Sequence, residues 1–317
     1  MLKKISIKKM KPVLGLILFS VAITIIRPNF MTSANLLNVL RQTSINAIIA
    51  AGMTFVILTG GIDLSVGSIL AFSSAVGVWM LQTGNGIAVS VLVCLVIGAL
   101  AGLFNSVVIT RGNIQPFIAT LATMTLLRGA TLVFTGGKPL AISFSKDAIN
   151  LSSLRFFQKI GSGKVLGIPI PIIIMIVVFL LCWHILRNMA IGRYIYAIGG
   201  NEEAAKLSGL NVKKIKAMAY VFNGVLAALA GLILASRLVS AQPTAGNGYE
   251  LDAIAAVVLG GTSLAGGQGS VLGTILGALI IGVLNNALNL MDVSSYYQMI
   301  CKAIVILIAV LLDRKEK

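Results

Sequence analysis

The chain alternates long apolar runs with short polar connections, and this alternation constrains its fold more than any other feature of the sequence. Ten runs approach the length of about 20 mostly apolar residues that a helix needs to cross a bilayer. They lie at residues 11–27, 44–60, 64–82, 87–109, 115–135, 167–186, 215–235, 252–268, 270–289 and 297–312. Charged residues make up 11% of the chain, against about 25% in soluble domains. We therefore predict an all-α integral membrane protein, a polytopic bundle of about ten transmembrane helices.

Two of the ten runs are weaker candidates than the rest. Residues 64–82 begin almost directly after residues 44–60, and residues 252–268 are short and rich in glycine at their end. The segment before the second run, residues 33–43, interleaves leucines with polar side chains. That segment is either a short helix lying at the membrane surface or an extension of the second run.

Lysine and arginine indicate which ends of the runs face the cytoplasm. With an even number of spans both termini lie on one side. If that side is the cytoplasm, fifteen of the 25 Lys and Arg residues lie in cytoplasmic segments and eight in outer ones, as the positive-inside rule requires. We therefore predict cytoplasmic termini and an outer loop at about residues 136–166. The same distribution accounts for the net charge of +16 without a nucleic-acid partner.

A charged stretch at residues 187–216 separates two of the runs and is a predicted cytoplasmic loop. It holds six basic residues and two of the nine acids of the chain. Asn201 can cap a short helix over Glu202–Leu207, because an Asn side chain accepts from free backbone N–H groups and acids suit the positive end of a helix. Gly209 would then let the chain leave this helix. From these residues alone, the stretch is either an ordinary charged loop or a rigid contact surface.

The inventory of reactive side chains argues against an enzyme. The single histidine, His184, lies within an apolar run, and its immediate neighbours offer no partner for catalysis or for a metal ion. The three cysteines lie within apolar runs and have no disulfide or metal spacing. The segments ending at Lys138 and Lys164 lack the Ser or Thr that follows the Lys of a phosphate loop. We expect no catalytic residue, metal site or cofactor here, and if the chain takes part in a process that costs ATP, another chain must bind the ATP.

Ionisable residues inside or beside apolar runs are costly and are functional candidates for that reason. Asp63, close to Ser65 in the turn TGGIDLSVGS, either caps the following helix or takes part in transport. Glu250 and Asp252 open the eighth run and allow the same two interpretations. Arg128 lies about 20 Å along its run at about 1.5 Å per residue. We predict that it pairs with an acid or with backbone carbonyls inside the bundle.

Further polar residues lie in the last two runs. Lys302 lies near the outer end of its run, from which its side chain can extend to the membrane surface. Asn285 and Asn289 lie four residues apart and share one face of a helix. Together with Asn286 they either form bonds between helices or bind the hydroxyl groups of a sugar.

Glycine recurs at positions where helices or turns come close together. Two pairs have the spacing that allows close helix packing, namely Gly98 with Gly102 and Gly273 with Gly277. Two glycine-rich turns, at residues 58–68 and 259–270, are similar to each other. Their similarity reflects either repeated halves, as in many transporters, or the common composition of turns.

Longer motifs carry a resemblance to a known family. The run Glu203-Ala204-Ala205, with Gly209 after it, resembles the EAA loop of ABC importer permeases. Five longer segments resemble the permease subunits of bacterial ABC importers for ribose, galactose, xylose and autoinducer-2: TGGIDLSVGS, PFIATLATMTLLRG, GRYIYAIGGNEEAAKLSGLNV, SAQPTAGNGYELDAIAAVVLGGTSLAGGQGS and VSSYYQMICKAIVILIAVLLD. The resemblance runs from about Asn29 to Asp313, is densest over Ser240–Leu290 and is weakest over residues 138–164. Among the cargoes of this family, ribose fits best.

The resemblance implies a single transmembrane permease domain over residues 1–317, in the bacterial cytoplasmic (inner) membrane. It implies a homodimer that works with a cytoplasmic ABC ATPase, which binds ATP and magnesium, and with an extracytoplasmic sugar-binding protein. The residues expected to contact the ATPase are Gly200, Asn201, Glu202, Glu203, Ala204, Ala205 and Gly209. The candidates for the translocation path or its gate are Asp63, Ser65, Gln242, Pro243, Thr244, Asn285 and Asn289. The alternatives are an ion-coupled sugar carrier that works alone, and an ABC permease for another sugar or autoinducer-2.

Overall fold

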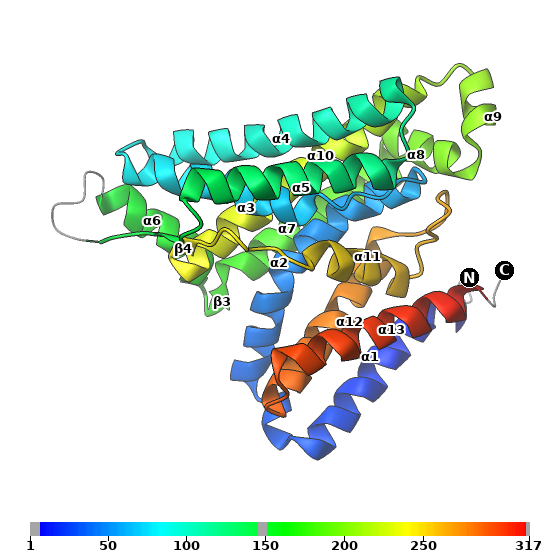
Figure 1. Cartoon of the computed structure of the whole chain (residues 1–317). Coiled ribbons are helices and arrows are strands. Elements are labelled where there is room, and N and C mark those ends of the chain that lie inside the picture. Colours follow the sequence, from blue (N-terminus) through cyan, green and yellow to red (C-terminus); the bar gives the residue numbers. More distant parts are fainter. Residues whose placement is uncertain (1–6, 145–150, 315–317) are drawn as a thin grey trace.

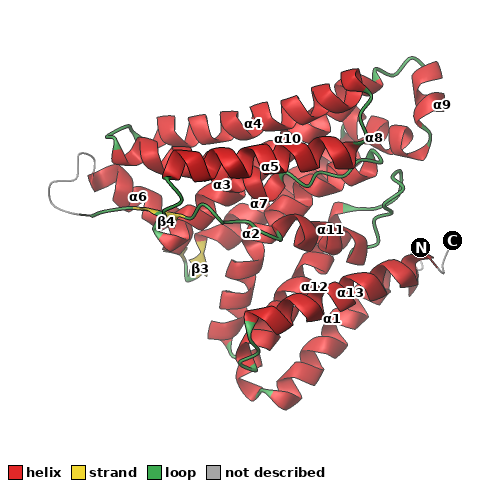
Figure 2. Cartoon of the chain, viewed as in Figure 1, coloured by secondary structure: helices red, strands yellow, loops and turns green. Residues whose placement is uncertain are grey.

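The computed structural model describes residues 7–144 and 151–314, and Figure 2 shows that this part of the chain is built almost wholly of helices. The first helices are α1 (Ile7–Ile26), the 3-10 helix η1 (Pro28–Met31), α2 (Ser33–Leu58), α3 (Val66–Gln82), α4 (Ile87–Gly112), α5 (Pro116–Thr135) and α6 (Leu151–Ser162). The others are α7 (Ile170–Asn188), α8 (Ala190–Gly200), α9 (Glu202–Leu207), α10 (Val212–Leu238), α11 (Tyr249–Leu259), α12 (Val271–Leu290) and α13 (Ser295–Arg314). Two antiparallel pairs of short strands complete it: β1 (Leu140–Ala141) with β4 (Ser240–Ala241), and β2 (Lys164–Val165) with β3 (Ile168–Pro169).

Within the described residues, six helices are long and apolar enough to cross a membrane: α2, α4, α5, α7, α10 and α12. The apolar part of α1 and helix α3 are shorter. Helices predominate because a chain surrounded by lipid must pair its backbone polar groups internally. The predicted helical membrane class is confirmed.

Two expectations about individual segments are settled by the helix bounds. Helix α2 begins at Ser33, so residues 33–43 extend the second run and the separate surface helix is wrong. The predicted span at residues 252–268 is also wrong. Helix α11 ends at Leu259 after 11 residues, and at 1.5 Å per residue a helix of that length covers only about 16 Å.

Two helices lie where the sequence indicated polar loops. Helix α6 occupies much of the expected outer loop at 136–166, and it buries Leu154 and Phe157. Its Gly161 N–H donates to Ser236 Oγ of α10 at 2.7 Å. The charged stretch contains α8 as well as the expected α9. Both missed helices are short and amphipathic, and they gain their stability from packing against longer helices rather than from a long apolar run.

Helix α10 lies at the centre of the larger of two helix groups. Figure 1 shows α3, α4, α5 and α10 alongside one another, and α1, α12 and α13 grouped on the other side of α2. The predicted close packing is confirmed: Gly98 and Gly102 of α4 face the backbone of α10, and Gly273 and Gly277 of α12 face the backbone of α11 and its end. The start of α1, the end of α13 and α9 lie toward one end of the molecule, and α6 lies at the other (Figure 1).

Candidate functional site

Helix α9 is held in a defined position by its own end residues and by an ion pair. Asn201 Oδ1 accepts from the N–H of Ala204 at 2.9 Å, so the predicted cap is confirmed. Glu202 pairs with Lys216 of α10 at 2.6 Å. Gly209 has φ +82°, the left-handed conformation expected for a residue just after a helix. The result is a short, rigid helix between α8 and α10.

The end of α8 contacts both glycine-rich turns. A Cβ atom on Gly199 would overlap the carbonyl oxygen of Leu58 and the amide nitrogen of Gly267. The same Gly267 N–H donates to the Leu58 carbonyl at 3.0 Å. Gly266 and Gly267 in turn leave no room for a side chain beside Gly199 and Gly200. We call these five residues the glycine junction, and they join α8 to the end of α2 and to the turn before α12.

A tyrosine strengthens this contact. Tyr196 of α8 donates its hydroxyl proton to the carbonyl of Gly269 at 3.0 Å. Burial raises the pKa of Tyr196 above its usual value, so the phenol stays protonated and remains a donor. Movement of α8 would therefore act directly on the turn that leads into α12.

Asp63 and Ser65 lie in a separate buried cluster. The Asp63 carboxylate accepts from the Ser65 N–H at 2.9 Å and from the Ser65 hydroxyl at 2.6 Å. It also accepts from Asn223 Nδ2 of α10 at 2.9 Å, and Asn105 Nδ2 of α4 donates to Ser65 Oγ at 2.8 Å. These bonds position the start of α3 against α4 and α10. The N-cap residue of α3 is Ser65, and no side chain of the described residues caps the helix, so Asp63 bonds to the residue at the helix start without capping the helix itself. A role of Asp63 in transport stays a prediction.

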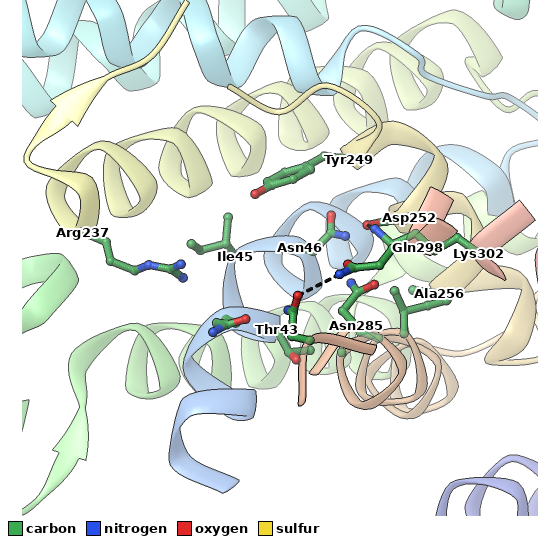
Figure 3. Close-up of a pocket in the computed structure, with 15 residues that line it drawn as sticks. Thr43, Ile45, Asn46, Arg237, Tyr249, Asp252, Ala256, Asn285, Gln298 and Lys302 are labelled. Carbon is green, nitrogen blue, oxygen red and sulfur yellow. Dashed lines mark hydrogen bonds and ion pairs between the residues drawn. The ribbon is translucent and has the colours of Figure 1, made fainter. Parts of the chain in front are cut away.

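A polar cavity of about 240 Å³ lies between α2, α11, α12, α13 and the end of α10 (Figure 3). Asn285 and Asn289 both line it, as their shared helical face predicted. Gln298 Nε2 donates to Asn289 Oδ1 at 2.9 Å. Asp252 and Lys302 form an ion pair of 2.9 Å in its wall. The expected extension of Lys302 to the membrane surface is therefore wrong, because Asp252 offers it a charged partner inside the protein.

Three side chains in the cavity wall have buried oxygens without a hydrogen-bond partner among the described residues. They are Thr43 Oγ1, Asn46 Oδ1 and Asn285 Oδ1. By contrast, Asn286 exchanges two hydrogen bonds with Asn35 of α2, at 2.9 and 3.0 Å. Adjacent asparagines of α12 thus have different environments, since Asn286 joins two helices and Asn285 faces the cavity.

The expected gate residues Gln242, Pro243 and Thr244 lie in the non-helical segment between β4 and α11. Arg128 Nη1 donates to the carbonyls of Pro243 and Ala245, each at 2.8 Å. The prediction that Arg128 pairs with carbonyls is thus confirmed. Non-helical backbone at membrane depth must be satisfied by protein, and Arg128 supplies two of the required hydrogen bonds.

We expect Arg128→Met to loosen this segment locally. Methionine keeps much of the side-chain volume but leaves the two carbonyls without their donor, at a cost of about 1–3 kcal/mol. Hydrogen exchange should accelerate at the amide of Ala245, which bonds to Gln242 at 3.0 Å, and stay unchanged in distant helices. Arg155→Met on the exposed face of α6 is the matched control. Unchanged exchange at Ala245 would mean that Arg128 does not hold the segment.

Only some of the residues predicted to line the translocation path or its gate lie together in the structure. Asn285 and Asn289 meet at the cavity, whereas Asp63 and Ser65 lie in their own cluster and residues 242–244 lie outside the cavity wall. His184 contacts Asn188 at 3.0 Å and is exposed. Sequence reasoning overlooked several cavity residues: Thr43, Asn46, Arg237, Tyr249 and Gln298. Polar side chains inside the apolar run of α2 were the available signal for the first two.

Comparison with known proteins gives a consistent result. The family model described as "Branched-chain amino acid transport system / permease component" matches residues 35–310. The ribose import permease protein RbsC of Haemophilus influenzae is 58% identical over 300 residues, covering 95% of this chain and 91% of its own. Its counterpart in Bacillus subtilis is 54% identical over 309 residues, 98% and 94% of the two chains. The D-allose transport system permease protein AlsC of Escherichia coli is 38% identical over 286 residues, 90% and 85% of the two chains. No solved structure matches.

Proposed function

Because the chain belongs to the branched-chain amino acid transport system / permease component family, we propose that it is the membrane subunit of an ABC importer that carries D-ribose into the cytoplasm. The observation that carries the proposal is the 58% identity to a ribose import permease over 95% of this chain. The family description mentions amino acids, but a D-allose permease also aligns with 90% of the chain. The family description therefore covers more than one substrate, and the individual relatives indicate the cargo better than the family description does. The resemblance read from the motifs is confirmed.

The chain has no role as an enzyme in this scheme. ATP and magnesium are bound by a partner ATPase in the cytoplasm, and a sugar-binding protein delivers ribose from outside. We further propose that two copies of the permease form a homodimer in the bacterial inner membrane, each copy being one permease domain. Closure of the ATPase would rock the two copies around the path between them.

Helix α9 has the features of a surface that docks on the ATPase. Glu203 and Leu207 are exposed and lie four residues apart, so they share one helical face. Leu207 is 88% exposed, and an exposed leucine on a rigid helix suits a groove in a partner. The loop residues from Gly200 to Gly209 form the proposed contact, and the glycine junction would pass its movement to α2 and α12.

The proposed topology has both termini in the cytoplasm, on the side of α9. Support comes from the distribution of Lys and Arg and from the position of α9, the start of α1 and the end of α13 toward one end of the molecule (Figure 1). In this topology α11 crosses only part of the bilayer. The chain segment of Gln242, Pro243 and Thr244 returns to membrane depth before it and serves as a gate. Asn285 and Asn289 line the translocation path. Asp63 and Ser65 hold the glycine-rich turn at residues 58–68, which leads into α3.

The test is uptake of labelled ribose into vesicles that contain the permease, its ATPase and its binding protein. We expect uptake to require ATP, to stop with vanadate and to continue when an uncoupler removes the ion gradient. The alternative, an ion-coupled carrier, needs acids that can exchange protons inside the membrane. Asp252 is already paired with Lys302. Uptake that survives vanadate but collapses with the uncoupler would overturn our proposal.

A further inference from the structure

We propose that the polar cavity is a binding site for one monosaccharide, held through its hydroxyl groups by the permease itself. This inference rests on the proposed function and goes further, because it gives the permease a share in recognising the cargo. The cavity is formed by segments far apart in the sequence: Asn46 of α2 and Asn285 of α12 both face it.

The unpartnered oxygens are the first argument. Thr43 Oγ1, Asn46 Oδ1 and Asn285 Oδ1 are buried without a hydrogen bond, and Thr43 is only 4% exposed. Leaving such groups unpaired is costly, so they are expected to find a partner in some state of the transport cycle. An amide oxygen only accepts hydrogen bonds. The missing partner of Asn46 Oδ1 and Asn285 Oδ1 must therefore donate, as a sugar hydroxyl does.

Charge is the second argument. Asp252 and Lys302 neutralise each other across 2.9 Å, so the acid does not call for a cation. Arg237 also lines the cavity, and its five donors can be shared among several hydroxyl oxygens. Gln42 and Tyr249 add groups that both donate and accept. This mixture of donors and acceptors suits the hydroxyl groups of a polyol.

Size is the third argument. The cavity volume of about 240 Å³ is well above the roughly 10–15 Å³ that one water molecule needs. That space can hold a single pentose. The apolar walls at Ile45, Ile281 and Ala256 can cover the C–H surfaces of the ring. A transport site must also release its cargo, so we expect weak binding.

The position of the cavity agrees with this role. Helix α11 is too short to cross the membrane, and its first turn contributes Tyr249 and Asp252 to the cavity wall. Interrupted helices often surround the substrate sites of transporters. The segment held by Arg128 leads directly into this helix, so a gate movement there would reach the cavity.

The experiment uses the full chain in lipid nanodiscs, with D-ribose as the probe and saturation-transfer NMR as the binding measurement. Asn46→Leu and Asn285→Leu should each weaken ribose binding about five- to tenfold, the effect of losing one hydrogen bond to a ligand. The control is Asn188→Leu on α7. Asn188 is exposed, and among the described residues its side chain bonds to His184 alone, so this variant should bind ribose as the wild type does.

Thermal unfolding of the same variants separates a ligand site from a structural role. Replacing Asn46 or Asn285 removes a buried oxygen that has no partner, so the melting temperature should stay the same or rise. Asn286→Leu breaks the pair with Asn35 and should lower it. A lower melting temperature in Asn46→Leu and Asn285→Leu, with ribose binding unchanged, would overturn the proposal.

Uptake by the complete transporter distinguishes this inference from the proposed function. If the wild-type complex imports ribose with ATP while both cavity variants bind and import it equally well, the cavity is not a sugar site and the proposed function stands. If the wild type imports no ribose, the proposed function fails. Stronger signals from ribose 5-phosphate than from ribose would indicate an anion site at Arg237 and would also overturn the inference.

Discussion

Gly199→Ala should strongly reduce ATP-driven ribose uptake while leaving the permease in the membrane. The added methyl group would overlap backbone atoms of Leu58 and Gly267, which cannot rotate away as a side chain does. Overpacking of this kind costs about 1–3 kcal/mol, and about 1.4 kcal/mol is a factor of ten. We therefore expect uptake to fall about tenfold or more, because α8 can no longer sit against both glycine-rich turns.

The measurement is ribose uptake and ATP hydrolysis in the same reconstituted complex. Continued hydrolysis with lost uptake is the expected result, since the damage lies between α9 and the bundle. Gly129→Ala on α5 is the matched control, because nothing lies within 4 Å of a Cβ at that position. Wild-type uptake by Gly199→Ala would show that the glycine junction transmits no movement.

Asp63→Asn should lower the stability of the whole bundle. Asparagine has nearly the same shape, but its NH2 group only donates, so it would face either the Asn223 amide or the Ser65 backbone N–H, each of which donates to Asp63. We expect the free energy of unfolding to fall by about 1–3 kcal/mol. Asp63→Ala should cost more, because it leaves the Ser65 N–H, the Ser65 hydroxyl and the Asn223 amide without their acceptor, at about 1–3 kcal/mol for each buried group left unpaired.

Unfolding in detergent, followed by fluorescence of Trp79 and Trp183, measures this change. Asp292→Asn is the control. Asp292 is exposed in the turn after α12, and its φ of +56° is a conformation that Asn tolerates. An equal loss of stability in Asp63→Asn and Asp292→Asn would mean that the buried network around Asp63 contributes no more to stability than an exposed turn residue does.

The sequence predicted the long helices well and the interrupted ones poorly. Lipid forces each long apolar run to form a helix, so α4, α5, α7 and α10 lie where the runs do. Helix α11 has the same apolar composition as a full span, and only its glycines at 260 and 261 mark its early end. The bounds of α9 could be predicted to the residue, because Asn201 and Gly209 mark its two ends with local chemistry.

The candidate site was harder to predict because it depends on contacts between distant segments. Asn285 and Asn289 were found, since polar residues on one face of an apolar helix are visible in the sequence. Their relation to Thr43 and Asn46 was not, because the two pairs meet only when α2 packs against α12. No local pattern could show that Gly199 would touch Leu58 and Gly267.

The ion pair between Asp252 and Lys302 also has a consequence for how the protein is made. Its two members are 50 residues apart, so Asp252 leaves the ribosome well before its partner. A lone charge entering the bilayer costs roughly 2.5–3.5 kcal/mol on insertion scales. The last helix therefore completes the charge balance of a segment synthesised earlier. A chain that ends before α13 would keep an unmatched carboxylate in the wall of the polar cavity.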